Sequence, residues 1–275
     1  MVKKVNLTDF LNRTDLHKST IKILKLIHEK TNKEIEFIYD SKLNVDAKVT
    51  VARSFMDRHI IFFGDVKKGT IDHLIAHECG HILRYYSVST EKRMIPMTNN
   101  QSYQIASMDL ERKNQTMFQR IPPEVKQKII PFWITGFIQQ LTNLPVDYYI
   151  ETWIFNEYPD LREFQANSIN VSYLRASQGL DPQIKKRVPD LLYKGSNAMN
   201  YAYFKKLDQV MGTDYFHIYK KFPDKKLGEK LFNLINDHDS GFESDITTIN
   251  NWADELNVNK WFSWIPFDMN QESNI

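Results

Sequence analysis

One segment constrains this chain more than any other. Residues 73–83 read HLIAHECGHIL, so three of the eight histidines in a chain of 275 residues stand four positions apart. Successive residues of an α-helix are rotated by about 100°, so His73 and His81 would lie roughly 40° to either side of His77. Glu78 directly follows the middle histidine and would lie about 100° away from it. The spacing predicts a helix whose polar stripe consists of imidazoles and one carboxylate.

The opposite side of this helix is apolar, because it carries Ile75, Cys79 and Ile82. We expect Cys79, the only cysteine of the chain, to be a small buried residue. A solvated helix face is usually rich in ordinary charged and polar residues, and it does not explain a stripe of histidines. The stripe therefore favours a metal site.

Residues 77–81, HECGH, match the HExxH pattern. Side chains four residues apart on a helix have Cβ atoms about 5–6 Å apart, so both imidazoles can reach one tetrahedral zinc ion at about 2.0–2.1 Å. The intervening glutamate points beside the ion, where it can take a proton from a zinc-bound water and pass it to a leaving amine. We therefore predict His77 and His81 as ligands of Zn²⁺ and Glu78 as the catalytic base.

A catalytic zinc ion usually has a third protein ligand and one open position. The next histidine after His81 is His217, so we expect a carboxylate from a later helix. In residues 144–159, Asp147 and Glu151 are four positions apart among apolar and aromatic residues. Because burying a lone carboxylate is costly, one of the two should bind the ion and the other should hold a ligand histidine by its second nitrogen. The alternative is that Asp147 caps a helix and Glu151 forms a surface salt bridge.

A strand, an HExxH helix and a later helix with an acidic pair resemble the zincin metallopeptidases, and most closely their glutamate branch, the gluzincins. The resemblance covers roughly residues 59–159. In gluzincins a glutamate is the third ligand and an acidic residue four positions later orients a ligand histidine, whereas here Asp147 precedes Glu151. The resemblance implies Glu151 as the third ligand, and the reversed order leaves Asp147 as the alternative. It also implies that the strand RHIIFFG (58–64) lies at a sheet edge and pairs with the substrate.

The distribution of apolar residues predicts an α+β fold that is mainly α-helical. Short apolar runs at 34–39, 47–52 and 59–64 predict a small N-terminal β-sheet before the HExxH helix, and most of the later sequence has a helical pattern. Prolines mark boundaries in that helical part, and Pro145 suits the first turn of a new helix.

Two regions are expected along the chain. Residues 1–160 would form the zincin-like catalytic region, with the polar segment 88–123 as an insertion near the cleft. Residues 161–275 would form a helical C-terminal region packed on the same body, and they resemble nothing specific.

Charge and composition narrow the expected partners. The 36 basic and 34 acidic residues give a formal net charge of +2, which provides no electrostatic case for binding nucleic acid. The N-terminal residues contain no apolar core of a secretory signal, and the most apolar stretch, 129–138, is about half the length of a membrane span. We therefore expect a cytoplasmic protein with a peptide or protein substrate and no nucleic-acid or membrane partner; the oligomeric state stays open.

The expected function is that of a zinc-dependent metallopeptidase, a hydrolase like the compact cytoplasmic HExxH proteins of bacteria. The alternative is a regulatory or structural protein that keeps the zinc site without proteolysis. A di-iron bundle would need a second Glu-x-x-His segment, and the chain contains none.

Overall fold

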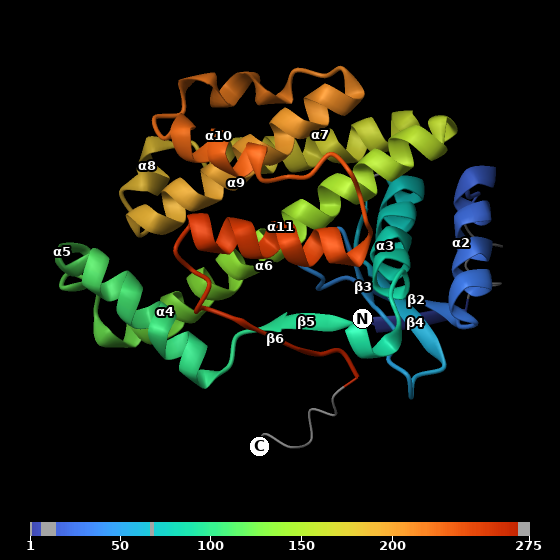
Figure 1. Ribbon diagram of the computed structural model, residues 1–275, viewed down its shortest axis with the longest axis horizontal. Helices are drawn as coiled ribbons and strands as arrows, with labels where there is room; N and C mark the ends of the chain where they lie inside the picture. The colour runs from blue at the N-terminus through green and yellow to red at the C-terminus, as the bar shows by residue number, and fades with distance from the viewer. Residues whose placement is uncertain (1, 7–14, 67–68, 269–275) are drawn as a thin grey trace. The chain divides into compact units, whose positions relative to one another are not determined.

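The computed structural model describes residues 2–6, 15–66 and 69–268 (Figure 1). These residues are mainly α-helical, with one four-stranded and one two-stranded sheet, so the predicted α+β class is confirmed. The contacts divide the chain into two units. The first comprises Met1–Arg93, Tyr149–Ser172 and Pro266–Ile275, and the second comprises Met94–Tyr148 and Tyr173–Ile265. The segments of the two units alternate along the chain. The division expected from the sequence, into residues 1–160 and 161–275, stays a prediction.

The first unit contains the four-stranded sheet and the helix with the histidine stripe. Its elements are β1 (Val2–Asn6), α2 (Lys18–Thr31), β2 (Glu34–Asp40), β3 (Ala47–Thr50), β4 (Arg58–Phe63), α3 (Ile71–Tyr86) and η1 (Thr90–Lys92). It also includes the end of α6 (Pro123–Glu157), η2 (Pro159–Leu161) and the first part of α7 (Arg162–Gln178).

The strand order of this sheet is β1-β2-β4-β3. β4 runs parallel to β2, with Phe37 opposite Ile61, and antiparallel to β3. The expectation that residues 58–64 form an edge strand is therefore wrong, because β4 is paired on both sides. Its apolar sequence is that of an interior strand, and Ile61 is buried. Within the described residues the edges are β1 and β3.

Helix α3 packs against α2 and β3, and α2 and α3 run side by side in Figure 1. Ile75, Cys79 and Ile82, the apolar side predicted for α3, are all buried. The beginnings of the two helices are joined by Asp72, whose Oδ1 accepts hydrogen bonds from the His17 amide at 2.8 Å and the Thr20 hydroxyl at 2.6 Å. The hydrophobic side of α3 and its polar start thus fix the direction in which the opposite, histidine-bearing side points.

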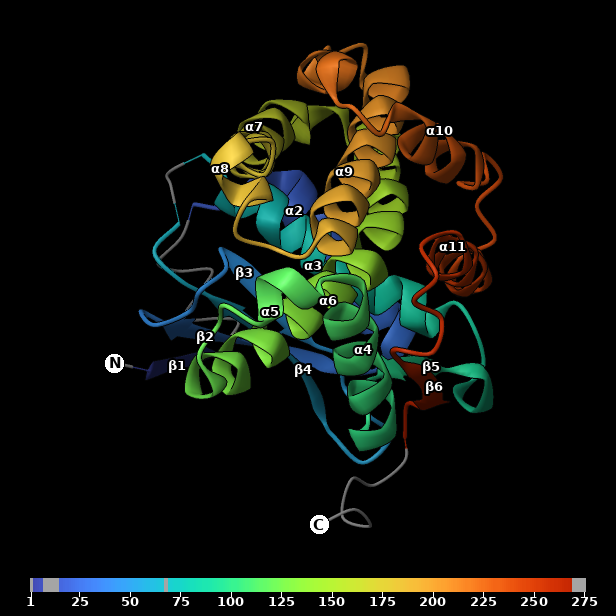
Figure 2. The same cartoon turned by 90° about the vertical axis from the view of Figure 1, so that its left-hand side faces the viewer.

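The second unit is almost entirely helical. Its elements are β5 (Met94–Met97), α4 (Asn100–Lys113), α5 (Gln115–Phe118), most of α6, the end of α7, α8 (Pro182–Lys185), α9 (Asp190–Met211), η3 (Tyr215–Lys221), α10 (Lys225–Asn233), α11 (Phe242–Glu255) and most of β6 (Ser263–Pro266). β5 and β6 pair in a two-stranded sheet. The long helix α9 packs closely against α10, as seen in Figure 2. The segment 88–123, expected as an insertion, forms η1, β5, α4 and α5.

Helix α6 continues from the second unit into the first as one helix of 35 residues. The expectation that a new helix starts at Pro145 is wrong, because Pro131 and Pro145 both lie inside α6. Each proline removes one helical hydrogen bond, but burial of side chains such as Leu141 and Ile150 holds the flanking turns together. Among the described residues no helix, α6 included, has the length and apolarity that a membrane span requires.

Candidate metal centre

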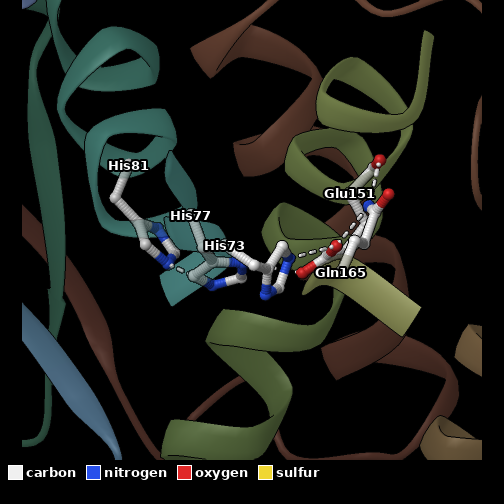
Figure 3. A network of polar contacts seen from close by, with 5 residues as sticks. All are labelled: His73, His77, His81, Glu151 and Gln165. Carbon is white, nitrogen blue, oxygen red and sulfur yellow. Dashed lines mark hydrogen bonds and ion pairs between the residues drawn. The ribbon is translucent and has the colours of Figure 1, made fainter. Parts of the chain in front are cut away.

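Helix α3 presents His73, His77 and His81 on one side, and α6 brings Glu151 to them (Figure 3). The predicted stripe of imidazoles is therefore present, and its neighbour is one of the two predicted carboxylates. Glu151 is only 2% exposed, so it does not form a surface salt bridge. Asp147 lies in the interior of α6 and caps no helix end, so that alternative reading of the acidic pair is wrong.

Three hydrogen bonds hold the Glu151 carboxylate, and a fourth holds the main-chain carbonyl of the same residue. His73 Nε2 lies 2.9 Å from Oε2, and His77 Nδ1 lies 2.8 Å from Oε1. Gln165, on α7, donates from Nε2 to Oε2 at 2.6 Å and to the main-chain carbonyl of Glu151 at 2.9 Å. Figure 3 shows these side chains converging on the carboxylate from α3 and α7.

The protonation of this network follows from the environment of Glu151. Burial alone would raise the pKa of its carboxyl group, but the charge of His73 and the hydrogen bonds from His73 and His77 outweigh burial and hold the pKa well below its usual range. An ionised carboxylate only accepts hydrogen bonds, so His73 Nε2 and His77 Nδ1 must both carry hydrogen. Neutral His77 then has its lone pair on Nε2.

The Nε2 atoms of His77 and His81 lie 3.2 Å apart, with ring centroids 5.0 Å apart. At 3.2 Å the two Nε2 atoms are within hydrogen-bond distance, so one of them carries the hydrogen and the other the lone pair. Two nitrogens that each stand about 2.0–2.1 Å from one tetrahedral ion are separated by about 3.3–3.4 Å, so a slight parting of the two rings would suit zinc ligands. The two histidine contacts of Glu151, at 2.8 and 2.9 Å, are also hydrogen bonds.

Within the first unit, His73, His77 and Glu151 offer three donor atoms that all lie within 4.8 Å of one another. A metal ion could therefore be held by this buried cluster. His77 turns Nδ1 toward Glu151 and Nε2 toward His81. Asp147 lies one turn before Glu151, as the spacing of the pair predicts.

Glu78 follows His77 on α3 and is 7% exposed. It does not belong to the group of donor atoms formed by His73, His77 and Glu151. Cys79 is fully buried, as predicted, and burial followed by the nearby Glu78 charge raises the pKa of its thiol far above its usual range. A thiol in that state remains protonated and is a poor metal ligand.

For two residues of the network, the contacts could not be predicted from the sequence. Gln165 is 1% exposed and contacts Glu151, but no motif links it to a carboxylate fourteen residues earlier in the chain. His73 belongs to the stripe, yet the stripe does not reveal which atom it contacts. The available signal is that a buried carboxylate needs several donors, which predicts that polar residues surround Glu151 without identifying them.

Comparisons of the chain with protein-family models, with curated proteins and with solved structures found no match. The functional interpretation therefore rests on the side chains of α3, α6 and α7.

Proposed function

We propose that this protein is a zinc-dependent metallopeptidase that hydrolyses peptide bonds in peptides or proteins in the cytoplasm. The observation that carries the proposal is the pair of Nε2 atoms 3.2 Å apart on the HECGH helix, with a carboxylate on the second nitrogen of His77. This combination is typical of a zinc ligand whose orientation is fixed by a neighbouring acidic residue.

Within this proposal, His77 and His81 bind zinc through Nε2 and Asp147 is the third ligand. Support comes from the acidic pair itself: Glu151 is engaged with the second nitrogen of His77, which leaves Asp147, one turn earlier on α6, for the ligand position. Glu151 then orients His77, because it contacts Nδ1 and not the nitrogen that faces His81. This choice is the alternative to the ligand that the gluzincin resemblance implies, and it follows from the order of the acidic pair along α6.

Glu78 would serve as the general base in peptide hydrolysis. A zinc ion bound here would supply Lewis acidity, which lowers the pKa of a water molecule toward about 7 and polarises the scissile carbonyl. Glu78 would accept the proton of the attacking water and deliver it to the leaving amine. This role is supported by its position one residue after His77, about 100° around α3.

Strand β3 is the best candidate for binding an extended substrate. It lies at an edge of the sheet as far as the described residues go, and it packs against α3. Main-chain hydrogen bonds to such an edge give affinity for an extended peptide with little dependence on its side chains. Ala47–Thr50, and not residues 58–64, is therefore the strand that we propose pairs with the substrate.

The test is the zinc content of the purified protein together with hydrolysis of a mixed peptide substrate, compared between wild type and Glu78→Gln. We expect about one zinc per chain in both, and a loss of hydrolysis of at least about 10²-fold in the variant. Glu124→Gln, which changes an exposed glutamate at the start of α6, is the matched control and should keep both properties.

Three other outcomes have distinct meanings. Retained hydrolysis in Glu78→Gln would overturn the mechanism. A chain that binds no zinc even when zinc is supplied would overturn the metallopeptidase proposal as a whole. Bound zinc without hydrolysis of any peptide would favour the alternative of a regulatory or structural protein that retains the site.

A further inference from the structure

The first histidine of the stripe is not explained by a zinc site at His77 and His81. His73 and His81 are eight residues apart on α3, which corresponds to about 12 Å along the helix axis. Ligands of one zinc ion lie much closer together, since each stands about 2 Å from the ion. His73 therefore cannot share an ion with His81. The burial of its side chain requires another explanation.

His73 makes one hydrogen bond within the described part of the chain. Its side chain is almost fully buried, its Nε2 contacts Glu151 Oε2, and its Nδ1 is buried with no hydrogen-bond partner among the described residues. A buried polar atom left without a partner destabilises the fold. Among the described residues, the hydrogen bond to Glu151 is thus the one that the His73 side chain makes.

The two oxygens of Glu151 are held by different histidines. His77 takes Oε1 and His73 takes Oε2, so rotation of the carboxylate about its Cγ–Cδ bond would break both contacts. A carboxylate with one donor could turn or tilt, whereas one with a donor on each oxygen has a fixed plane. His73 therefore determines the angle at which Oε1 meets His77.

Gln165 fixes the rest of the Glu151 side chain. The two hydrogens of its amide nitrogen go to Oε2 and to the main-chain carbonyl of Glu151, at 2.6 and 2.9 Å. One amide group thereby connects the end of the side chain to its own backbone, which holds the side chain in a single rotamer. Gln165 is 1% exposed, so water does not compete for these two hydrogen bonds.

We infer that His73 and Gln165 form a clamp on Glu151 that positions His77 for metal binding, and that His73 is a positioning residue and not a ligand. The inference rests on the proposed function for its consequence, the binding of zinc by His77. The clamp itself consists of contacts between protein side chains, so it can be tested separately from zinc.

Four variants and one control test the clamp. His73→Leu and Gln165→Leu remove the donors, and His73→Asn keeps a donor on a side chain too short to reach Oε2. His73→Gln places an amide N–H at a reach similar to that of imidazole Nε2. His217→Gln changes an exposed histidine, 67% exposed in its side chain, and is the control for the substitution itself.

The first measurement is zinc affinity by competition with a chelator. Loss of a partner that orients a ligand typically costs about 10–100-fold in metal affinity, and we expect this loss in His73→Leu, His73→Asn and Gln165→Leu. His73→Gln should recover most of the affinity, and His217→Gln should equal the wild type. Circular dichroism of each variant shows whether it folds. If the leucine variants do not fold, the comparison of His73→Asn with His73→Gln tests the clamp.

The second measurement is the proton NMR signal of His77 Nδ1–H in the metal-free protein. Held by Glu151, this hydrogen should give a resolved, slowly exchanging signal in the wild type. The signal should weaken or shift in His73→Asn and return in His73→Gln. Because the rings of His73 and His77 also contact each other, with centroids 5.9 Å apart, and both variants remove the His73 ring, recovery in His73→Gln but not in His73→Asn isolates the hydrogen bond to Glu151.

The outcomes separate this inference from the proposed function. Unchanged zinc affinity and an unchanged His77 signal in a folded His73→Asn would overturn the clamp. Two zinc ions per wild-type chain, with one lost in His73→Leu, would also overturn it, because His73 would then be a ligand of a second ion. A wild type that binds no zinc but shows the expected dependence of the His77 signal would keep the clamp and remove the metallopeptidase proposal.

Discussion

Gly80 and Ile150 lie so close together that a Cβ atom on Gly80 would stand 2.5 Å from Cγ2 of Ile150. Ile150 is buried and branched at Cβ, so its side chain has little freedom to move aside. The glycine inside HECGH therefore allows α3 and α6 to approach each other at the level of the histidine stripe. The residue after Ile150 is Glu151, whose contact with His77 depends on this approach.

We predict that Gly80→Ala destabilises the protein by about 1–3 kcal/mol because the added methyl group overpacks the contact. Alanine is intrinsically better than glycine inside a helix, so this loss opposes a local gain of about 1 kcal/mol. Urea unfolding measures the change. Gly136→Ala in α6 is the matched control: no atom lies within 4 Å of the added Cβ, so it should stabilise by about 0.5–1 kcal/mol. Equal stabilisation by both changes would contradict the close contact.

The sequence predicts the parts of this protein that depend on local periodicity. The stripe on α3 and its apolar side follow from the spacing of a few neighbouring residues, and both are present. Carboxylates in apolar surroundings predict a buried partner for the histidines, which Glu151 provides. These predictions need no knowledge of which elements meet.

Features that depend on contacts between distant segments could not be predicted in the same way. The sequence does not reveal which nitrogen of His77 faces Glu151, because this depends on how α6 lies against α3. The local rule for Pro145 predicts a helix start, but tertiary packing keeps α6 continuous. The apolar run of β4 is equally suited to an edge and to an interior strand, and only its pairing with β2 and β3 decides between them.

The acidic pair on α6 should separate into two roles when each acid is replaced by its amide. Asp147→Asn removes the charge of the proposed third ligand, so we expect bound zinc to be lost. Glu151→Gln weakens the support of His77 and should cost about 10–100-fold in zinc affinity while stoichiometric binding persists at high zinc. Chelator competition measures both, with Asp214→Asn, an exposed aspartate, as control. The opposite ranking would assign Glu151 as the ligand, as the gluzincin resemblance implies.

His59 should make the folded state sensitive to acid. It is fully buried on β4, and its Nδ1 accepts a hydrogen bond from the Ala52 amide at 2.9 Å, which requires that nitrogen to carry no hydrogen. Its Nε2 then donates to the Thr31 hydroxyl at 3.1 Å. Burial, together with the charges of Lys33 and Arg93, lowers the pKa of His59 from 6.5 to about 4.

The sign of the pH effect follows from the two states. The unfolded chain protonates His59 near pH 6.5, whereas the folded chain resists protonation down to about pH 4. The contribution of His59 to the free energy of unfolding is therefore fully present above pH 6.5. It decreases as the pH falls toward 4, by roughly 3 kcal/mol in total. Urea unfolding at pH 7 and pH 4.5 should show most of this loss in the wild type.

His59→Asn isolates this contribution, because the asparagine Oδ1 can accept from the Ala52 amide without titrating. Its stability should vary less between pH 7 and pH 4.5 than that of the wild type, whatever its absolute value. His238→Asn replaces an exposed histidine and should keep the wild-type pH dependence. Parallel pH profiles of wild type and His59→Asn would show that His59 is not held in its neutral form.

Cys79 should report on the opening of α3. Its thiol is inaccessible and its pKa is raised by burial, so the native state offers almost no reactive thiolate. We expect no measurable reaction with a disulfide reagent at pH 8 in the native protein and one thiol per chain in urea, since Cys79 is the only cysteine.

Slow labelling of Cys79 in the native state would then follow local or global unfolding. Gly80→Ala should accelerate it by about tenfold for each 1.4 kcal/mol of destabilisation. Fast labelling of the wild type would contradict the burial of this side of α3.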